Sequence, residues 1–223
     1  MRPVQLAPSI LSADFSRLGE QIRAVEPYAG RIHVDVMDGH FVPNLSMGPV
    51  VVRSIRPITA LPIEVHLMVT NPENFVEAFA TAGADRLVFH IEVVEDPAAL
   101  AKRIRTLGVS AGLAVNPETL WDGVEPHLGE IDLAILMTVN PGFGAQAFLD
   151  HVLPKVQKAR SRLTQMGVDV DIEVDGGIGL QTASKAKEEG ANVFVAGNAI
   201  FSSPGGKNPA SAARELARLV GAQ

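Results

Sequence analysis

The sequence predicts a (β/α)8 barrel, the TIM-barrel fold, from three observations. Eight short apolar runs of strand type alternate with eight segments that have helical spacing or helix-starting residues. A polar residue or a glycine stands near the end of each apolar run, around positions 9, 35, 66, 90, 115, 137, 175 and 197. The length of 223 residues suits eight such units, because these barrels take about 200–250 residues. We therefore expect one barrel domain over residues 1–223.

The expected strands are short and rich in Val, Ile and Leu. The clearest runs over residues 32–36, where Ile32, Val34 and Val36 alternate with His33 and Asp35. An alternation with a period of two is typical of a strand, and it places His33 and Asp35 on one face. The expected strands together are 4–10, 32–36, 63–69, 86–91, 109–115, 131–139, 170–174 and 192–196.

The expected helices lie between these strands. Ser12 and Asp14 precede the first and are residues that cap helix N-termini, and Pro72 suits a first helical turn. Gly108 and Gly190 follow two others, where a helix commonly ends. The expected helices together are 15–25, 50–55, 71–80, 97–107, 117–127, 148–163, 180–189 and 209–219.

A doubly wound open sheet is the rival fold for alternating strands and helices. Such a sheet normally carries a G-x-G-x-x-G turn or a P-loop after an early strand. Neither motif follows an early strand of this sequence, so the pattern favours the barrel.

Composition and charge exclude several classes of protein. The chain is 47% hydrophobic and only 5% aromatic, with a net charge of −6 and no basic run, so nucleic acid is not an expected partner. It has no cysteine, which excludes a disulfide scaffold, a Cys nucleophile and a thiolate metal site. No apolar run approaches the ~20 residues of a membrane span, and no signal peptide is recognisable. We expect a soluble cytoplasmic protein without a membrane partner.

Four side chains of ligand type stand at the expected strand ends. They are His33, Asp35, His66 and Asp175, and they come from three strands. Active sites of these barrels lie at the carboxyl ends of the strands, so the four would converge on one mouth. Two His and two Asp can hold one divalent ion per subunit, Zn²⁺, Fe²⁺, Mn²⁺ or Co²⁺. The alternative for each histidine alone is a buried polar side chain that is merely paired.

Three late loops are rich in glycine. Glycines let backbone N–H groups approach an anion, and barrels often bind phosphate with the loops after their last two strands. The alternative is that each glycine only makes a tight turn. Three adjacent loops favour phosphate. The candidate residues are Gly142, Phe143, Gly144, Gly176, Gly177, Gly197 and Asn198.

Three methionines, Met37, Met68 and Met137, lie at or just beyond strand ends. Methionine commonly fills gaps in a core. Here the three could also form an apolar wall that excludes water from a reactive intermediate. The residues themselves leave both interpretations open.

The longest motifs together resemble the ribulose-phosphate 3-epimerase family. They are L-A-P-S-I-L-S-A-D-F, H-V-D-V-M-D-G-H-F-V-P-N, E-V-H-L-M-V, V-N-P-G-F-G, E-V-D-G-G-I and V-A-G-N-A-I-F, and they cover nearly the whole chain. Two positions depart from the family pattern. Ala145 stands where the family usually has Gly, and Asn198 stands where it usually has Ser.

The resemblance implies a TIM barrel of the ribulose-phosphate-binding type and a homo-oligomer. It implies that Asp35 and Asp175 are the acid–base pair, and that His33 and His66 complete the metal ligands. It also implies a sugar-phosphate substrate held by the late glycines. Five further substrate contacts are implied, by Ser9, His66, Met37, Met68 and Met137.

The implied reaction converts D-ribulose 5-phosphate to D-xylulose 5-phosphate by inverting carbon 3. Inversion next to a ketone removes one proton and returns another to the opposite face, so two acids suit it, with an enediolate stabilised by a divalent metal between the two steps. The sequence leaves open a 3-epimerase of a ketohexose 6-phosphate such as allulose 6-phosphate. A lyase or decarboxylase would typically need a lysine near the reacting carbon, and the expected strands carry none. A non-catalytic sugar-phosphate binder would have no need for all four ligand-type residues.

Overall fold

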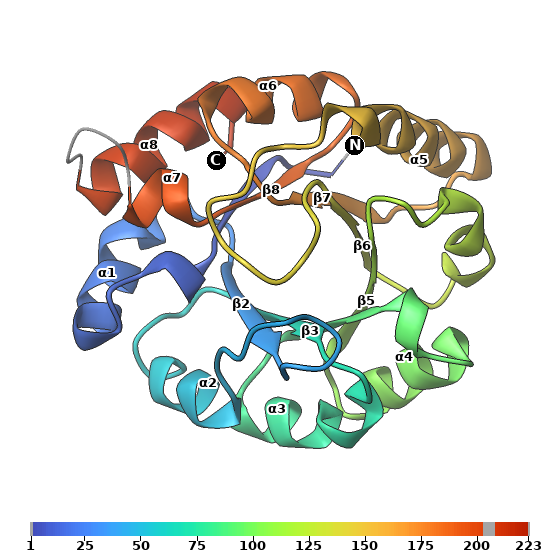
Figure 1. The fold of residues 1–223 in the computed structure, drawn as a ribbon, viewed down its shortest axis with the longest axis horizontal. Helices are drawn as coiled ribbons and strands as arrows, with labels where there is room; N and C mark the ends of the chain where they lie inside the picture. Colours follow the sequence, from blue (N-terminus) through green and yellow to red (C-terminus); the bar gives the residue numbers. More distant parts are fainter. Residues whose placement is uncertain (1, 203–207, 223) are drawn as a thin grey trace.

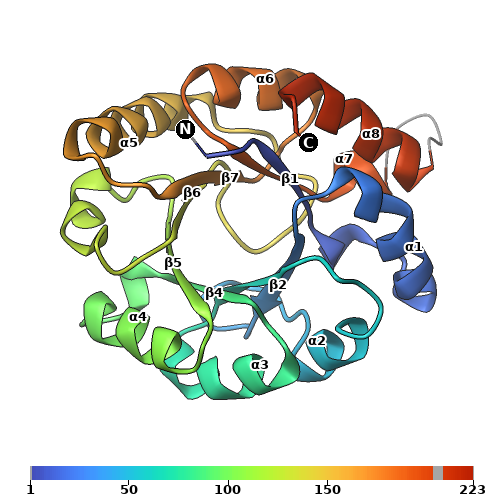
Figure 2. The same cartoon turned by 180° about the vertical axis from the view of Figure 1, so that it is seen from behind.

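Eight parallel strands form one twisted sheet that curves into a barrel, surrounded by helices (Figures 1 and 2). This computed structural model describes residues 2–202 and 208–222. The strand order is β1-β8-β7-β6-β5-β4-β3-β2, and all pairs are parallel. The TIM-barrel prediction is confirmed. The strands are β1 (Gln5–Pro8), β2 (Ile32–Met37), β3 (Ile63–Met68), β4 (Arg86–His90), β5 (Ser110–Val115), β6 (Leu133–Met137), β7 (Asp171–Asp175) and β8 (Val193–Ala196).

The barrel closes between β1 and β2 through few backbone contacts. The Gly30 N–H donates to the Leu6 carbonyl over 2.9 Å, and Ser9 forms an isolated parallel bridge with His33. Closure at this seam brings the carboxyl end of β1 next to β2. It therefore places Ser9 beside two of the predicted site residues.

The helices lie outside the sheet, and most of them match the expected positions (Figure 1). Asp14 caps the turn that precedes α1 by accepting from the Ser16 N–H, as its position predicted. Ser12 has no such role, because Ser9 caps the turn before it. The helices are α1 (Leu18–Val25), α2 (Pro49–Ile55), α3 (Val76–Ala82), α4 (Pro97–Thr106), α5 (Leu153–Met166), α6 (Leu180–Glu188), α7 (Asn198–Phe201) and α8 (Pro209–Val220).

The helix expected over residues 117–127 is wrong. Two short 3-10 turns, Trp121–Gly123 and Glu125–His127, occupy this connection instead. Pro126 lacks the N–H that a helix interior needs, and Gly123 adds a cost of about 1 kcal/mol relative to Ala. The apolar residues in this stretch still pack inward, since Trp121 is 1% exposed.

Other helix boundaries also differ from expectation, and the helix expected from residue 71 begins only at Val76, after a 3-10 turn over Pro72–Asn74. The helix after β6 begins at Leu153 and not at residue 148, because Pro154 favours the first turn and the Leu149 N–H donates to the Thr138 carbonyl over 2.8 Å. A short helix, α7, follows β8 directly, where only a glycine loop was expected. Such an extra helix after the last strand is frequent in phosphate-binding barrels.

Two apolar layers hold the barrel together. The larger lies between the sheet and the helices, and a smaller one fills the barrel interior with side chains such as Val88, Ile135 and Val193. Strand register arranges the interior side chains in levels. His33 is level with Glu64, Asp35 with His66, and Met37 with Met68.

A buried ionic network fills the barrel from the level of His33 and Glu64 downward. Arg31 is 4% exposed and its guanidinium contacts Glu64 at 2.7 Å, Asp171 at 3.3 Å and Glu173 at 3.5 Å. Removing one partner of such a network would leave a buried charge uncompensated, which typically costs about 3–5 kcal/mol. The network therefore fixes the positions of Glu64 and Glu173 beneath the mouth.

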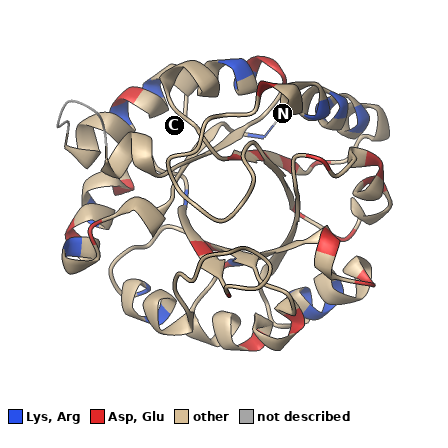
Figure 3. Ribbon diagram, viewed as in Figure 1, with Lys and Arg blue, Asp and Glu red and all other residues tan. Residues whose placement is uncertain are grey.

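The outer surface carries mixed charge. Lys and Arg are scattered over the outer helices with Asp and Glu among them (Figure 3). Within residues 2–202 and 208–222, no helix has both the length and the apolar composition needed to cross a membrane.

Candidate functional site

A pocket of about 690 Å³ opens at the carboxyl ends of the strands. All of the predicted site residues line it except His33 and His66, which are fully buried. Ser12 and Gln146 also line the pocket and were not predicted. The predicted residues in the lining are Ser9, Asp35, Met37, Met68, Met137, Gly142, Phe143, Gly144, Asp175, Gly176, Gly177, Gly197 and Asn198.

The four ligand-type side chains meet at the floor of this pocket. His33 Nε2 lies 3.2 Å from Asp35 Oδ1 and 3.7 Å from Asp175 Oδ2. His66 Nδ1 lies 3.4 Å and 3.3 Å from the same two oxygens. Strands β2, β3 and β7 supply them, so the barrel brings together residues far apart in the sequence.

These distances fit a small tetrahedral metal site. Bonds of about 2.1 Å place tetrahedral ligand atoms about 3.4 Å apart. One ligand atom from each of the four residues lies within 4.8 Å of the others. The Nδ1 atom of His66 is buried and lacks a hydrogen-bond partner, which is unusual unless the atom has another role. Two imidazoles and two carboxylates therefore fit a divalent ion.

The electrostatic environment at the floor of the pocket favours positively charged groups. Burial lowers the pKa of His66, but the neighbouring carboxylates of Asp175 and Asp35 outweigh burial and raise it. Burial also opposes the charged form of His33, yet the Asp35 carboxylate raises its pKa well above the usual value. For Asp35, burial raises the pKa, and the charge of His33 more than offsets this and lowers it. The same carboxylates would attract a divalent cation.

Glu64 orients His33 from the same level of the neighbouring strand β3. His33 Nδ1 lies 3.1 Å from Glu64 Oε1, and Arg31 and Arg86 contact the other oxygen of Glu64 at 2.7 Å and 3.1 Å. Burial opposes ionisation of Glu64, but Arg31 holds its pKa well below the usual value. An ionised Glu64 accepts the Nδ1 proton of His33 and leaves Nε2 free to bind a metal.

Glu173 is the second carboxyl beneath His33. Its Oε1 atom lies 3.3 Å from His33 Nδ1. Burial and then the charge of Glu64 raise the pKa of Glu173 to about 8. Neither glutamate was predicted for the site. The signal was present in E-V-H and E-V-D, because a glutamate two residues before His66 or Asp175 lies on the same strand face.

Ser9 holds the second oxygen of Asp35. The Ser9 hydroxyl donates to Asp35 Oδ2 over 2.5 Å and accepts from the Leu11 N–H at 3.3 Å. Asp35 Oδ1 therefore faces the histidines while Oδ2 faces Ser9. The side chains of Asp35 and Asp175 are 7% and 13% exposed, so both carboxyl groups reach the pocket.

A second histidine pair lies behind His66. His66 Nε2 is 2.9 Å from His90 Nε2, and His90 Nδ1 is 3.1 Å from Glu92 Oε2. Burial lowers the pKa of His90 to about 4. Burial raises the pKa of Glu92, but its hydrogen bonds, that to His90 first, lower it to about 2. His90 and Glu92 were not predicted, although both stand at the end of the fourth expected strand.

The three methionines lie at or above the level of the two acids. Met37, Met68 and Met137 are 4%, 2% and 2% exposed, and all three line the pocket. Met37 is level with Met68, and Met137 is level with Asp175. They give the pocket an apolar wall next to the acids.

The late loops gather on the opposite side of the pocket. Gly177 has a φ of +65°, and a Cβ there would lie 2.6 Å from the Phe148 backbone nitrogen, so the turn requires glycine. A Cβ at Gly197 would meet the Ser12 hydroxyl at 2.7 Å. Ala145 has a φ of +61°, a left-handed conformation that costs a residue with a Cβ about 1–2 kcal/mol.

Solved structures of similar fold belong to several kinds of protein. KGPDC from Streptococcus mutans superposes with a TM-score of 0.72 at 17% identity, over 99% of this chain and 98% of that one. A 3-hexulose-6-phosphate synthase gives a TM-score of 0.71 at 19% identity, over 96% and 99%. At such identities the likeness concerns the fold alone.

Fold and pocket define a TIM-barrel enzyme with its acids and loops at the carboxyl face of the strands. The sequence model described as the ribulose-phosphate 3 epimerase family matches residues 5–201. The chain belongs to this family. It is 47% identical to the ribulose-phosphate 3-epimerase of Bacillus subtilis, over 89% of this chain and 92% of that protein. It is 50% identical to the same enzyme of Synechocystis, over 90% and 89%.

Proposed function

We propose that this protein is a metal-dependent epimerase that converts D-ribulose 5-phosphate to D-xylulose 5-phosphate by inverting carbon 3. The observation that carries the proposal is the placement of two carboxyl groups, Asp35 on β2 and Asp175 on β7, in one pocket beside two histidines. Membership of the epimerase family supports the substrate.

The ligand atoms of the metal would be His33 Nε2, Asp35 Oδ1, His66 Nδ1 and Asp175 Oδ2. Two neutral imidazoles and two carboxylates offset the charge of a divalent cation, which favours its binding in a buried site. A divalent ion bound there supplies Lewis-acid stabilisation of the negative charge that develops on the substrate.

Each of the two acids carries out one of the two proton transfers. One carboxylate removes the proton from carbon 3, and the other, protonated, returns a proton to the opposite face of the planar enediolate. The Ser9 hydroxyl holds Asp35 Oδ2 at 2.5 Å, so this carboxyl group is fixed before substrate arrives. Met37, Met68 and Met137 keep water away from the intermediate.

The late loops bind the phosphate group. Backbone N–H groups of the loops around Gly177 and Gly197 supply hydrogen bonds, and the short helix α7 begins at Asn198 beside them. None of the described residues that line the pocket is Lys or Arg, so backbone and neutral side chains carry this recognition.

The function is tested by assaying purified protein with D-ribulose 5-phosphate and, separately, with D-allulose 6-phosphate. We expect faster turnover of the pentose phosphate, loss of activity on chelation, and recovery on adding Zn²⁺, Fe²⁺, Mn²⁺ or Co²⁺. Faster turnover of the hexose phosphate would support the ketohexose 6-phosphate alternative. Turnover of neither substrate by metal-loaded protein would refute the proposal.

Asn198→Asp is expected to raise KM for the sugar phosphate on the order of tenfold, because a carboxylate in the loop repels phosphate. The amide and the carboxylate have the same shape, so the backbone and the bound metal should be unchanged. Steady-state kinetics and elemental analysis measure both effects.

Gln165→Glu is the matched control, since it makes the same chemical change at an exposed position of α5. It should leave KM unaltered. An unaltered KM in Asn198→Asp as well would contradict phosphate binding at this loop.

A further inference from the structure

Two fully buried histidines share one hydrogen bond behind the metal-binding cluster. His66 Nε2 and His90 Nε2 are 2.9 Å apart, and the rings stack with centroids 5.0 Å apart at 18°. Two ring nitrogens at this distance need one donor and one acceptor. The direction of the bond decides which nitrogen of His66 carries its proton, and therefore whether Nδ1 can bind a metal.

Glu92 sets that direction. One of its oxygens, Oε1, accepts from the Asn116 N–H at 2.8 Å and from the Thr119 hydroxyl. The other, Oε2, lies 3.1 Å from His90 Nδ1. A carboxylate with these partners accepts only, so His90 Nδ1 is the donor.

The rest of the chain of hydrogen bonds follows from this donor. His90 packs against Phe41, with ring centroids 4.7 Å apart, and is 0% exposed, so a second proton on its ring would be costly. Neutral His90 therefore accepts at Nε2, and His66 donates from Nε2. The lone pair of His66 Nδ1 then faces Asp35 and Asp175.

We propose that Glu92 and His90 are positioning residues that fix the tautomer of His66, so that its Nδ1 is the metal ligand. This inference rests on the metal site of the proposed function. Glu64 fixes the tautomer of His33 by direct contact, whereas Glu92 fixes the tautomer of His66 through His90. Glu92 also accepts hydrogen bonds from Asn116 and Thr119. Through these bonds the connection after β5 contacts the relay to the metal site.

Glu92→Gln tests this relay with almost no change of shape. The amide oxygen keeps the contacts with Asn116 and Thr119, and the amide NH₂ then faces His90 Nδ1. To avoid two opposed donors, His90 must move its proton to Nε2, which forces the proton of His66 onto Nδ1. We expect Zn²⁺ affinity to fall about 10–100-fold, the usual range for an outer partner of a metal-binding histidine, with an unchanged melting temperature of the metal-free protein.

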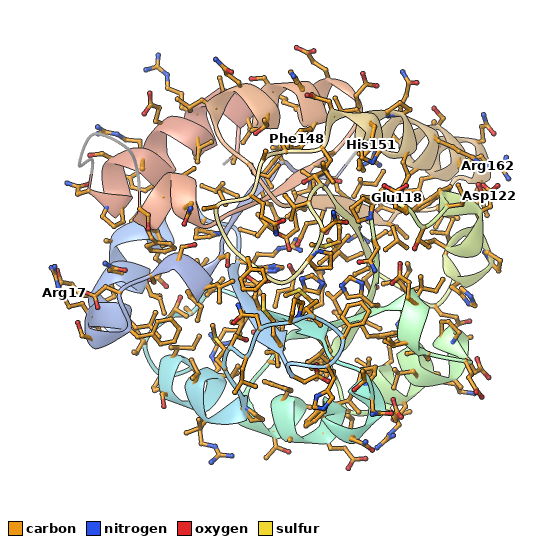
Figure 4. All side chains as sticks on the ribbon, in the orientation of Figure 1. Arg17, Glu118, Asp122, Phe148, His151 and Arg162 are labelled. Carbon is orange, nitrogen blue, oxygen red and sulfur yellow. The ribbon has the colours of Figure 1, made fainter. Side chains whose placement is uncertain are left out.

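Glu118→Gln is the matched control. Glu118 lies in the same connection, and its carboxylate pairs with His151 at 3.2 Å on the surface (Figure 4). The pair is exposed, at 84% for Glu118 and 56% for His151. This variant makes the same change beside an exposed histidine outside the cluster, so it should keep the wild-type Zn²⁺ affinity.

Two measurements decide the question. Chelator competition gives the Zn²⁺ affinity, and ¹⁵N NMR of the histidine rings shows which nitrogen of His90 carries the proton. We expect Nδ1–H in the wild type and Nε2–H in Glu92→Gln, a change that a purely structural role would not produce. Weaker affinity without this switch, or the switch without weaker affinity, would overturn the relay.

The NMR measurement also separates this inference from the proposed function. If the wild-type protein bound no metal, the proposed function would fail. The direction of the His66–His90 bond would then still be read from the metal-free protein, where Nε2–H on His90 in the wild type would overturn the relay.

Discussion

Asp35→Asn and Asp175→Asn are each expected to lower epimerisation at least 10²–10⁴-fold, the usual contribution of general acid–base catalysis. The amide keeps the shape of the carboxyl group but has no titratable proton. A complete inversion uses both acids, so neither variant should retain useful turnover. Weakened metal binding adds to the loss, because Asp35 Oδ1 and Asp175 Oδ2 both face the histidines.

Isotope exchange distinguishes the two faces of the substrate. Each metal-loaded variant is incubated in D₂O with each epimer, and deuterium uptake at carbon 3 is followed together with configuration. We expect exchange without inversion on the face served by the surviving acid. Asp122→Asn, an exposed aspartate paired with Lys158, is the control and should invert normally. Normal inversion by both site variants would leave Asp35 and Asp175 as metal ligands only.

His66→Ala and His33→Ala are each expected to remove most of the bound metal and to lower activity at least about 100-fold. Loss of an outer partner of a ligand alone typically costs 10–100-fold, so loss of a ligand should cost no less. Elemental analysis before and after gel filtration gives the metal content, and circular dichroism checks that the barrel is folded.

His151→Ala is the control for the histidine change, because the His151 side chain is 56% exposed and pairs with Glu118 (Figure 4). It should keep metal and activity. Full activity of metal-free wild-type protein would overturn the metal-dependent mechanism. Full metal content in both site variants would show that the ion binds elsewhere.

Local sequence patterns predicted most of the fold. Each strand was found within a few residues, because alternation in runs such as 32–36 reflects side chains that face the barrel interior and the helices in turn. The helix over 117–127 was the failure, since its helical apolar spacing contained Pro126 and Gly123. The short helix α7 was missed because its four residues are too few to show a period.

The sequence predicted the pocket residues that stand at strand ends, but it missed the residues that lie behind them. Asp35 and Asp175 stand where a strand meets a loop, a position that sequence alone can recognise. Glu64 and Glu173 lie one level deeper than the two acids and look like ordinary strand residues. His90 contacts His66 only across neighbouring strands, and Glu92 contacts His90. No local pattern encodes such distances.

The sequence by itself determined which side chains the barrel offers at its mouth, because strand alternation and loop position are local properties. Only the tertiary structure decided how they are used. Closure of the barrel brings β2, β3 and β7 within 3.2–3.7 Å at their ligand atoms. Pairing of β2 with β3 and of β3 with β4 places Glu64 beside His33 and His90 beside His66. The nitrogen that each of these histidines presents to the pocket floor therefore depends on partners from neighbouring strands, and those partners meet only in the folded sheet.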